Sequence, residues 1–186
     1  MDALEALLTR DSAVRLEPPG PDAAALDAIF RSALRAPDHG RLRPWRFLVI
    51  GGEARERFGA VLADALQRRD PAAPPESLAR ERQKALRAPV IVVVAATVKP
   101  SDKIPEVEQV ISAGAAAQNI MLAVHALGFG AMWRTGAPAY DPTVKAALGL
   151  KPDDAIVGFL YIGTRSGGAA PYPRPAPDDL VTTWRG

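Results

Sequence analysis

The chain has no cysteine among its 186 residues and only two histidines. Without cysteine it forms no disulfide, offers no thiolate nucleophile and holds no metal through sulfur. The histidines, His39 and His125, stand far apart with no H-E-x-x-H spacing, so we predict no metal site. Only 6% of the residues are aromatic. So few aromatic side chains argue against a platform that binds single-stranded nucleic acid by stacking bases.

A strong charge of one sign and long hydrophobic runs are also missing. The 23 Lys and Arg oppose 21 Asp and Glu, which leaves a net charge of only +2. Proteins that bind nucleic acid or a membrane surface usually carry a larger basic excess. No apolar run is long enough to span a bilayer, and no charged segment followed by an apolar one indicates a signal peptide. We therefore predict a cytoplasmic protein with no membrane or nucleic-acid partner.

Hydrophobic periodicity and turn residues predict the elements of one domain over 1–186, with a Pro- and Gly-rich extended tail at 165–186. Segments with helical periodicity lie at 1–10, 21–37, 52–69, 76–87, 105–128 and 141–149. Segments rich in β-branched or aromatic residues, typical of strands, lie at 45–50, 89–97, 130–134 and 155–164. This irregular order predicts an α+β fold with a central mixed or antiparallel sheet flanked by helices.

The composition of two of these segments predicts elements that are buried on more than one side. The sequence PVIVVVAAT at 89–97 is apolar throughout, as expected for a strand covered on both faces. The helix predicted at 105–128 is apolar or small on nearly every side of its middle. A helix without a polar face lies inside a core or between two subunits, so both locations stay open.

The familiar nucleotide and nucleophile motifs are absent. GFGAMW at 128–133 has the glycines of a dinucleotide-binding loop, but it follows a helix and leads into a strand. A Rossmann loop follows a strand and opens a helix, so that the pyrophosphate meets the helix N-terminus. No P-loop sequence occurs, and no G-x-S-x-G elbow supports a Ser–His–Asp triad.

Two segments instead gather cations near the expected helix ends. RDSAVR at 10–15 combines two guanidiniums with a hydroxyl, a set suited to phosphate, although the two arginines could simply satisfy carbonyls at the helix end. RAPDHGRLRPW at 35–45 places three further cations and a histidine before a strand. This loop binds an anion, or it is a solvated loop in which Trp45 covers the edge of the core.

A third segment, GFGAMWRTG at 128–136, follows the long predicted helix. Gly128 suits the left-handed position that ends a helix, and Gly130 permits close approach of another backbone. The next residues supply a flat aromatic ring at Trp133, a cation at Arg134 and a hydroxyl at Thr135. An edge strand with a core Trp is the alternative interpretation.

In their order and spacing these three segments, with IVGFLYIGT near the end, resemble the FMN-dependent nitroreductase family and its compact NAD(P)H-dependent branch. The resemblance covers about residues 2–163. It implies a nitroreductase-like fold, an intertwined homodimer and one FMN in each of two clefts between the subunits. The implied activity is an oxidoreductase with ping-pong kinetics, in which NAD(P)H reduces FMN and a nitroaromatic or quinone-like acceptor takes two electrons. Flavin N5 carries that chemistry, so no catalytic residue is predicted.

The resemblance also implies the residues that bind the cofactor. From one subunit these are Arg10, Asp11, Ser12, Trp133, Arg134 and Thr135. Arg35 and His39 are implied to reach the same flavin from the other subunit. Further candidates for flavin contact are Arg15, Arg43 and Arg174. Contact with the nicotinamide is implied at the end of the long helix, at Ala123, Val124, His125, Ala126, Leu127 and Gly128. His125, within that apolar helix, also fits a hydrogen-bonded core histidine.

The sequence departs from the family pattern at three positions, one of which is Arg43 in place of the usual Gln before Pro-Trp, and leaves two other functions open. Asp11 replaces a residue that is usually basic, and Val14 stands where Lys or Arg is common. The same fold could support other flavin chemistry, in a dehydrogenase, a flavin-fragmenting enzyme or a flavin-storing protein, because a fold does not determine a substrate. A module without enzymatic activity that binds anionic ligands or nucleic acid through Arg35, Arg41 and Arg43 is the other alternative.

Overall fold

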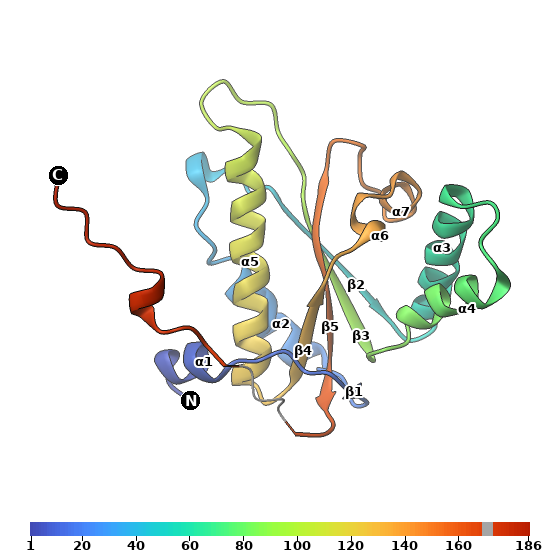
Figure 1. The fold of residues 1–186 in the computed structure, drawn as a ribbon, viewed down its shortest axis with the longest axis horizontal. Helices are drawn as coiled ribbons and strands as arrows, with labels where there is room; N and C mark the ends of the chain where they lie inside the picture. The colour runs from blue at the N-terminus through green and yellow to red at the C-terminus, as the bar shows by residue number, and fades with distance from the viewer. Residues whose placement is uncertain (169–172) are drawn as a thin grey trace.

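The computed structural model describes residues 1–168 and 173–186 of the chain. A sheet of five strands lies between two groups of helices (Figure 1). The helices on one side of the sheet are α1 (Ala3–Thr9), α2 (Ala23–Ala33) and α5 (Glu106–Ala126). On the other side are α3 (Ala54–Arg69), α4 (Pro75–Lys84), α6 (Ala137–Tyr140) and α7 (Pro142–Ala147). The predicted α+β fold, a sheet flanked by helices, is confirmed.

The central strand of the sheet is β5 (Ala155–Arg165), which pairs along its length with three other strands. Its partners are β3 (Val90–Ala96), β4 (Gly130–Arg134) and, at its last residues, β1 (Leu16–Glu17). The remaining strand, β2 (Trp45–Gly51), pairs with β3. Every pairing among the described residues is antiparallel, so the sheet is antiparallel rather than mixed.

Strand β3 is buried on both faces, as its apolar sequence predicts. Val92 and Val94 pack in the cluster that contains α2 and α5, whereas Ile91 and Val93 pack in the cluster that contains α3 and α7. Successive side chains of a strand point to opposite faces, so one apolar run supplies both cores. All four side chains are fully buried.

Helix ends follow the capping residues that the sequence places there. Asp2 forms a capping box with Glu5 at the start of α1, and the Asp22 side chain accepts the Ala25 N–H at the start of α2. At the end of α5, Gly128 has φ 83°, the left-handed conformation predicted for it. Strand β1 and helix α6 were not predicted, because elements of two and four residues are too short for periodicity to detect.

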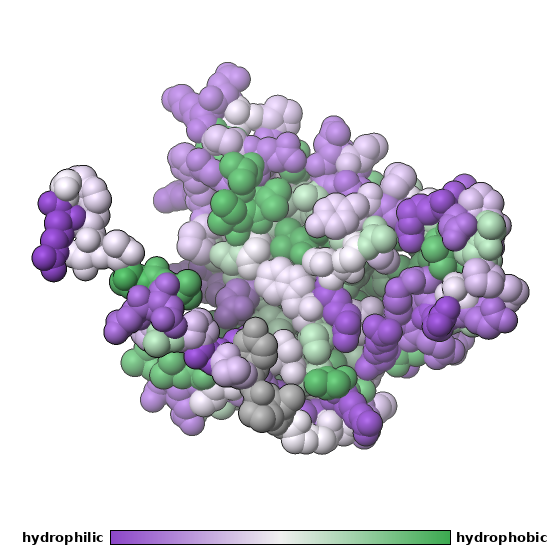
Figure 2. Space-filling view, viewed as in Figure 1, coloured by the Kyte–Doolittle hydropathy of each residue, from purple (hydrophilic) through white to green (hydrophobic). Residues whose placement is uncertain are grey.

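One side of α5 packs into the core, and its other side leaves apolar residues in solvent. Val107 and Ile111 near the start of α5 are 60% and 65% exposed, and Leu4 and Leu8 are exposed on α1, which lies at the other end of α5. Figure 2 shows hydrophobic residues gathered over α5 and hydrophilic ones over the α3–α4 pair. The tail residues 173–186 are exposed, including Trp184, and lead away from the sheet past α1 (Figure 1). Among the described helices, none is long and apolar enough to cross a membrane.

The close contact between α3 and α4 depends on Gly59. A Cβ atom at Gly59 would lie 2.6 Å from the carbonyl oxygen of Arg82, a backbone atom that cannot move aside alone. We expect Gly59→Ala to lower the free energy of unfolding by about 1–3 kcal/mol, measured by urea denaturation. The control is Gly51→Ala at the end of β2, where a Cβ would meet nothing closer than 3.8 Å. Equal stability of the two variants would contradict this account of the helix pair.

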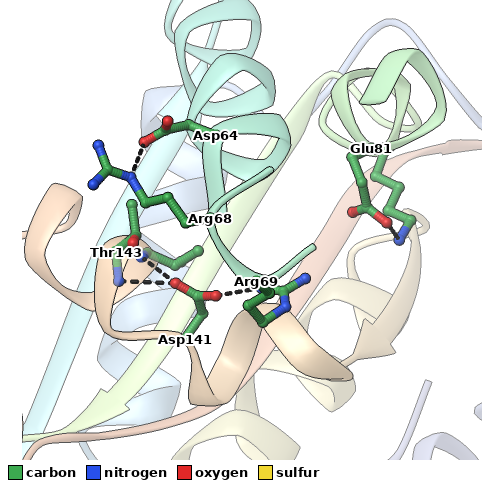
Figure 3. A network of polar contacts seen from close by, with 8 residues as sticks. Asp64, Arg68, Arg69, Glu81, Asp141 and Thr143 are labelled. Atoms are coloured by element: carbon green, nitrogen blue, oxygen red, sulfur yellow. Dashed lines mark hydrogen bonds and ion pairs between the residues drawn. The ribbon is translucent and has the colours of Figure 1, made fainter. Parts of the chain in front are cut away.

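A buried ion pair ties α3 to the start of α7. The Asp141 carboxylate, 2% exposed, pairs with Arg69 and accepts the backbone N–H groups of Thr143 and Val144 (Figure 3). Burial by itself raises the pKa of Asp141, but the hydrogen bonds from Arg69 and the two N–H groups outweigh it and leave the pKa below its usual value. The charged carboxylate therefore stabilises the fold.

We expect Arg69→Gln to lower the free energy of unfolding at pH 7 by about 2–3 kcal/mol, because it strands a buried carboxylate. A lowered pKa in the folded chain means that the contribution of Asp141 is complete above about pH 4 and is lost as the pH falls through the folded-state pKa. Urea denaturation should therefore show wild type and Asp141→Asn converging below that pH. Asp64→Asn, which breaks an exposed pair with Arg68, is the control and should change stability by less than about 0.5 kcal/mol. If the difference in free energy of unfolding between wild type and Asp141→Asn stays constant with pH, the charged Asp141 carboxylate is not the stabilising group.

Candidate functional site between the α3–α4 pair and strands β4 and β5

A cavity of about 400 Å³ opens between the α3–α4 pair and strands β4 and β5. Its aromatic walls are Phe58, Trp133, Phe159 and Tyr161. Its basic side chains are Arg69, Lys84, Arg87 and Arg134. The three predicted residues Trp133, Arg134 and Thr135 all line this cavity. Aromatic walls with cations at the rim suit a flat ligand that carries negative charge.

A second cavity of about 330 Å³ adjoins the first and is lined on one side by the N-terminal segment 13–17. The two cavities share Arg87, Arg134 and Tyr161. The predicted candidate Arg15 lines the second cavity together with Arg134, whereas Arg10, Asp11 and Ser12 line neither of the two cavities. Burial raises the pKa of Tyr161, and the nearby guanidiniums lower it by less. Its hydroxyl therefore stays neutral at physiological pH.

The four cations of the first cavity divide into paired and unpaired groups. Arg69 is paired with Asp141 and Lys84 with Glu81 (Figure 3). Arg87 and Arg134 form no ion pair with any residue that the structure describes. Two guanidiniums therefore remain available to a bound anion.

The Glu81 carboxylate is the second unusual feature of the cavity. One oxygen contacts Lys84, while Oε2 is buried and has no hydrogen-bond partner in the described part of the chain. A buried acceptor without a donor is destabilising by about 1–3 kcal/mol, and native proteins seldom leave one. A ligand with an N–H or O–H group in the cavity would supply the missing donor.

Arg10 and Ser12 lie at the end of α1, with side chains that form no hydrogen bond within residues 1–168 and 173–186. The guanidinium of Arg174 donates to the carbonyl oxygen of Arg10 over 3.4 Å, so the tail candidate lies beside the N-terminal motif. The Asp11 carboxylate is instead engaged by both terminal nitrogens of Arg165. That pairing lowers the pKa of Asp11. Direct contact between Asp11 and a cofactor stays a prediction.

Arg35 and His39 lie on the α5 side of the sheet, in hollows different from the cavity of Trp133. Arg35 lines an apolar groove between α1 and α5. His39 donates a hydrogen bond from Nδ1 to Glu108 Oε2 at 2.6 Å, since an ionised carboxylate only accepts, and lines a hollow beside Ile111. One chain therefore does not gather all the predicted cofactor residues. Arg43 is exposed, with φ 49° and its backbone N–H bonded to Asp38.

The segment predicted to contact nicotinamide forms the end of α5 and its cap. Ala123 and Ala126 line the groove of Arg35, whereas Val124 is buried in the core and Leu127 is exposed. Nε2 of His125 lies 2.9 Å from the hydroxyl of Thr9. His125 is thus a hydrogen-bonded residue that joins α5 to α1.

Sequence reasoning missed the contribution of α4 and the residues after it. Glu81, Lys84 and Arg87 line the first cavity, but α4 reads from its sequence as a polar, solvated helix. Glu81 and Lys84 are three residues apart at the end of α4 and so lie near one another, and Arg87 follows in the connection to the buried strand β3. That placement before a buried strand is the signal that could have suggested a site.

Residues 8–164 match the model of the family described as "Nitroreductase family". The chain is 45% identical over 167 residues to "Putative NAD(P)H nitroreductase YdjA" of Escherichia coli K12, covering 88% of each protein.

Two solved structures share the fold. A nitroreductase-like family protein from Bacillus cereus has a TM-score of 0.86 at 22% identity and covers 100% of this chain and 97% of its own. A variant of NfnB, described as an FMN and NADPH-dependent nitroreductase from a Sphigopyxis strain, has a TM-score of 0.79 at 25% identity and covers 100% of both chains. The family predicted from the three segments is confirmed: this chain belongs to the nitroreductase family.

Proposed function

We propose that this chain is an FMN-dependent oxidoreductase that uses NAD(P)H to reduce nitroaromatic or quinone-like acceptors by a ping-pong mechanism in the cytoplasm. The observation that carries the proposal is the cavity that joins aromatic walls to the unpaired guanidiniums of Arg87 and Arg134. The names of two similar proteins point the same way, since one is called an NAD(P)H nitroreductase and the other FMN and NADPH-dependent.

The residues of the two adjoining cavities fit FMN by shape and by chemistry. FMN has a flat tricyclic ring, a phosphate dianion and a pyrimidine edge on which an N–H lies between two carbonyls. The aromatic walls suit the ring, and the buried Glu81 Oε2 lacks the hydrogen-bond donor that such an N–H would provide. Lys84 and Arg87, which line the same cavity, are donors suited to the flanking carbonyls.

The chain's own residues would bind and orient the cofactor. Arg10 and Ser12, with Arg174 beside them, present donors suited to the phosphate and ribityl chain. The Trp133–Thr135 segment would hold the ring. Bound FMN supplies the two-electron chemistry, and the protein supplies position and charge. The guanidiniums of Arg87 and Arg134 would stabilise negative charge on the reduced cofactor.

A second copy of the chain would complete the site. Arg35 and His39 lie on the α5 side, away from the cavity, on a surface that also exposes the apolar residues Val107 and Ile111. Apolar surface of this kind is typical of an interface between proteins. We infer a homodimer in which the partner's Arg35 and the partner's His39 reach the flavin held by the first subunit.

The direct test of the proposal is the absorption spectrum of the purified protein with FMN, before and after NAD(P)H. We expect a bound flavin band near 450 nm that bleaches on reduction and returns when a nitroaromatic or quinone is added. Arg134→Gln should weaken FMN binding by about tenfold or more, since a charge-assisted hydrogen bond contributes about 1.5–3 kcal/mol. Arg57→Gln, an exposed arginine of α3 paired with Glu53, is the matched control. A protein that binds no FMN refutes the proposal, and one that binds FMN but is not reduced by NAD(P)H favours flavin storage.

Mixing two inactive variants tests whether the site is shared between subunits. Arg10→Glu and Arg35→Glu should each abolish FMN binding, by placing negative charge at the phosphate or at the partner's flavin. If each site needs Arg10 from one copy and Arg35 from the other, subunit exchange restores one intact site in every mixed dimer. Random exchange should then recover about a quarter of the wild-type FMN sites and activity. No recovery, with exchange verified by mass, would contradict the shared site.

A further inference from the structure

The side chain of Asp11, in the middle of the N-terminal motif Arg10–Ser12, is bound by Arg165. Both of its carboxylate oxygens accept hydrogen bonds from Arg165, at the end of β5, with 2.8 Å between Nη1 and Oδ2. A two-point guanidinium–carboxylate contact fixes orientation as well as distance. The side chains of Arg10 and Ser12, on either side of Asp11, take no part in it.

The residues after Asp11 are hydrogen-bonded to β4 and to the residue that follows β5. The Ala13 N–H donates to the carbonyl of Ala131 at 2.9 Å, and the Arg15 carbonyl accepts the N–H of Ser166 at 3.2 Å. A Cβ at Gly130 would lie 2.9 Å from the Ala13 Cβ, so the segment lies directly against β4. Only a glycine at position 130 permits this approach.

Exposure alternates from Asp11 to Val14 as it does along a strand, although these residues precede β1 and the alternation does not extend to Arg10, which is partly buried, or to Arg15, which is exposed. Ala13 is 2% exposed and Val14 is 72% exposed, while Ser12 is exposed and Asp11 is partly buried. Successive side chains in extended backbone point to opposite sides, so fixing Asp11 inward fixes Ser12 outward. A slip of one residue would reverse every side chain of the motif.

We propose that Asp11 is a positioning residue, whose pairing with Arg165 sets the register in which Arg10 and Ser12 face the phosphate of the bound flavin. This inference rests on the proposed binding of FMN. It differs from a direct contact between Asp11 and the cofactor, which the sequence resemblance implies.

The charge of Asp11 makes the two roles distinguishable. A carboxylate in direct contact with a phosphate repels it, so removing the charge would tighten FMN binding. A carboxylate that acts by holding the segment stabilises the bound form, so removing it would weaken FMN binding. Hydrogen bonding to Arg165 also lowers the pKa of Asp11 and raises that of Arg165, so the pair stays charged at neutral pH.

The experiment titrates FMN and riboflavin into the full-length protein, freed of flavin, and follows flavin fluorescence. We expect Asp11→Asn and Arg165→Gln each to weaken FMN binding by about tenfold. The double variant should be no weaker than either single one, because both remove the same interaction. The affinity for riboflavin, which has no phosphate, should decrease much less. The ratio of FMN affinity to riboflavin affinity should therefore fall at least about fivefold in each variant. Asp11→Glu keeps the carboxylate and should remain within about threefold of wild type.

Asp64→Asn is the control, since it breaks an exposed ion pair with Arg68 on α3 and should change neither affinity. Unchanged or tighter FMN binding by Asp11→Asn would overturn the proposal. So would equal losses for FMN and riboflavin, because a general loosening of the fold affects both ligands alike. Failure of the wild-type protein to bind either flavin would instead refute the proposed function itself.

Discussion

The structure depends on an antiparallel sheet whose inner strands are covered on both faces. β3 and the middle of β5 pack against α5 on one side and against α3 and α7 on the other. Because the inner strands are fully buried, polar side chains can gather only where the covering helices leave the sheet open. That opening lies beside β4 and the middle of β5, where Phe159 and Tyr161 line the adjoining cavities.

Charge at this opening is arranged by pairing. Arg69 is used to hold the wall of the cavity, because it pairs with the buried Asp141. Lys84 is partly neutralised by Glu81, while Arg87 and Arg134 remain unpaired among the described residues. The same division applies to the N-terminal motif, where Arg165 neutralises Asp11 and the Arg10 side chain forms no ion pair with residues 1–168 or 173–186. Carboxylates here neutralise the structural cations, and the remaining guanidiniums are available to an anionic cofactor.

Much of this could be predicted from the sequence, because the signals are local. The apolar run at β3, the left-handed Gly128 and the Trp133–Thr135 segment each follow from a few adjacent residues. The partner of Asp11 could not be predicted, since Arg165 is 154 positions away and only the fold brings them together. The placement of Lys84 shortly before a buried strand could have suggested a site, but a polar helix does not show which of its sides faces a cavity. The sequence resemblance supplied the family, and the coordinates supplied these contacts.

The central claim is that one flavin is held by residues of two copies of the chain. Sedimentation velocity with detection at both 280 and 450 nm tests it most directly, because it measures the mass of the species that carries the flavin. The account predicts that the 450 nm signal sediments with a particle of about twice the 19.7 kDa chain mass and with one FMN per chain. Flavin that sediments with a single chain at full occupancy would contradict it.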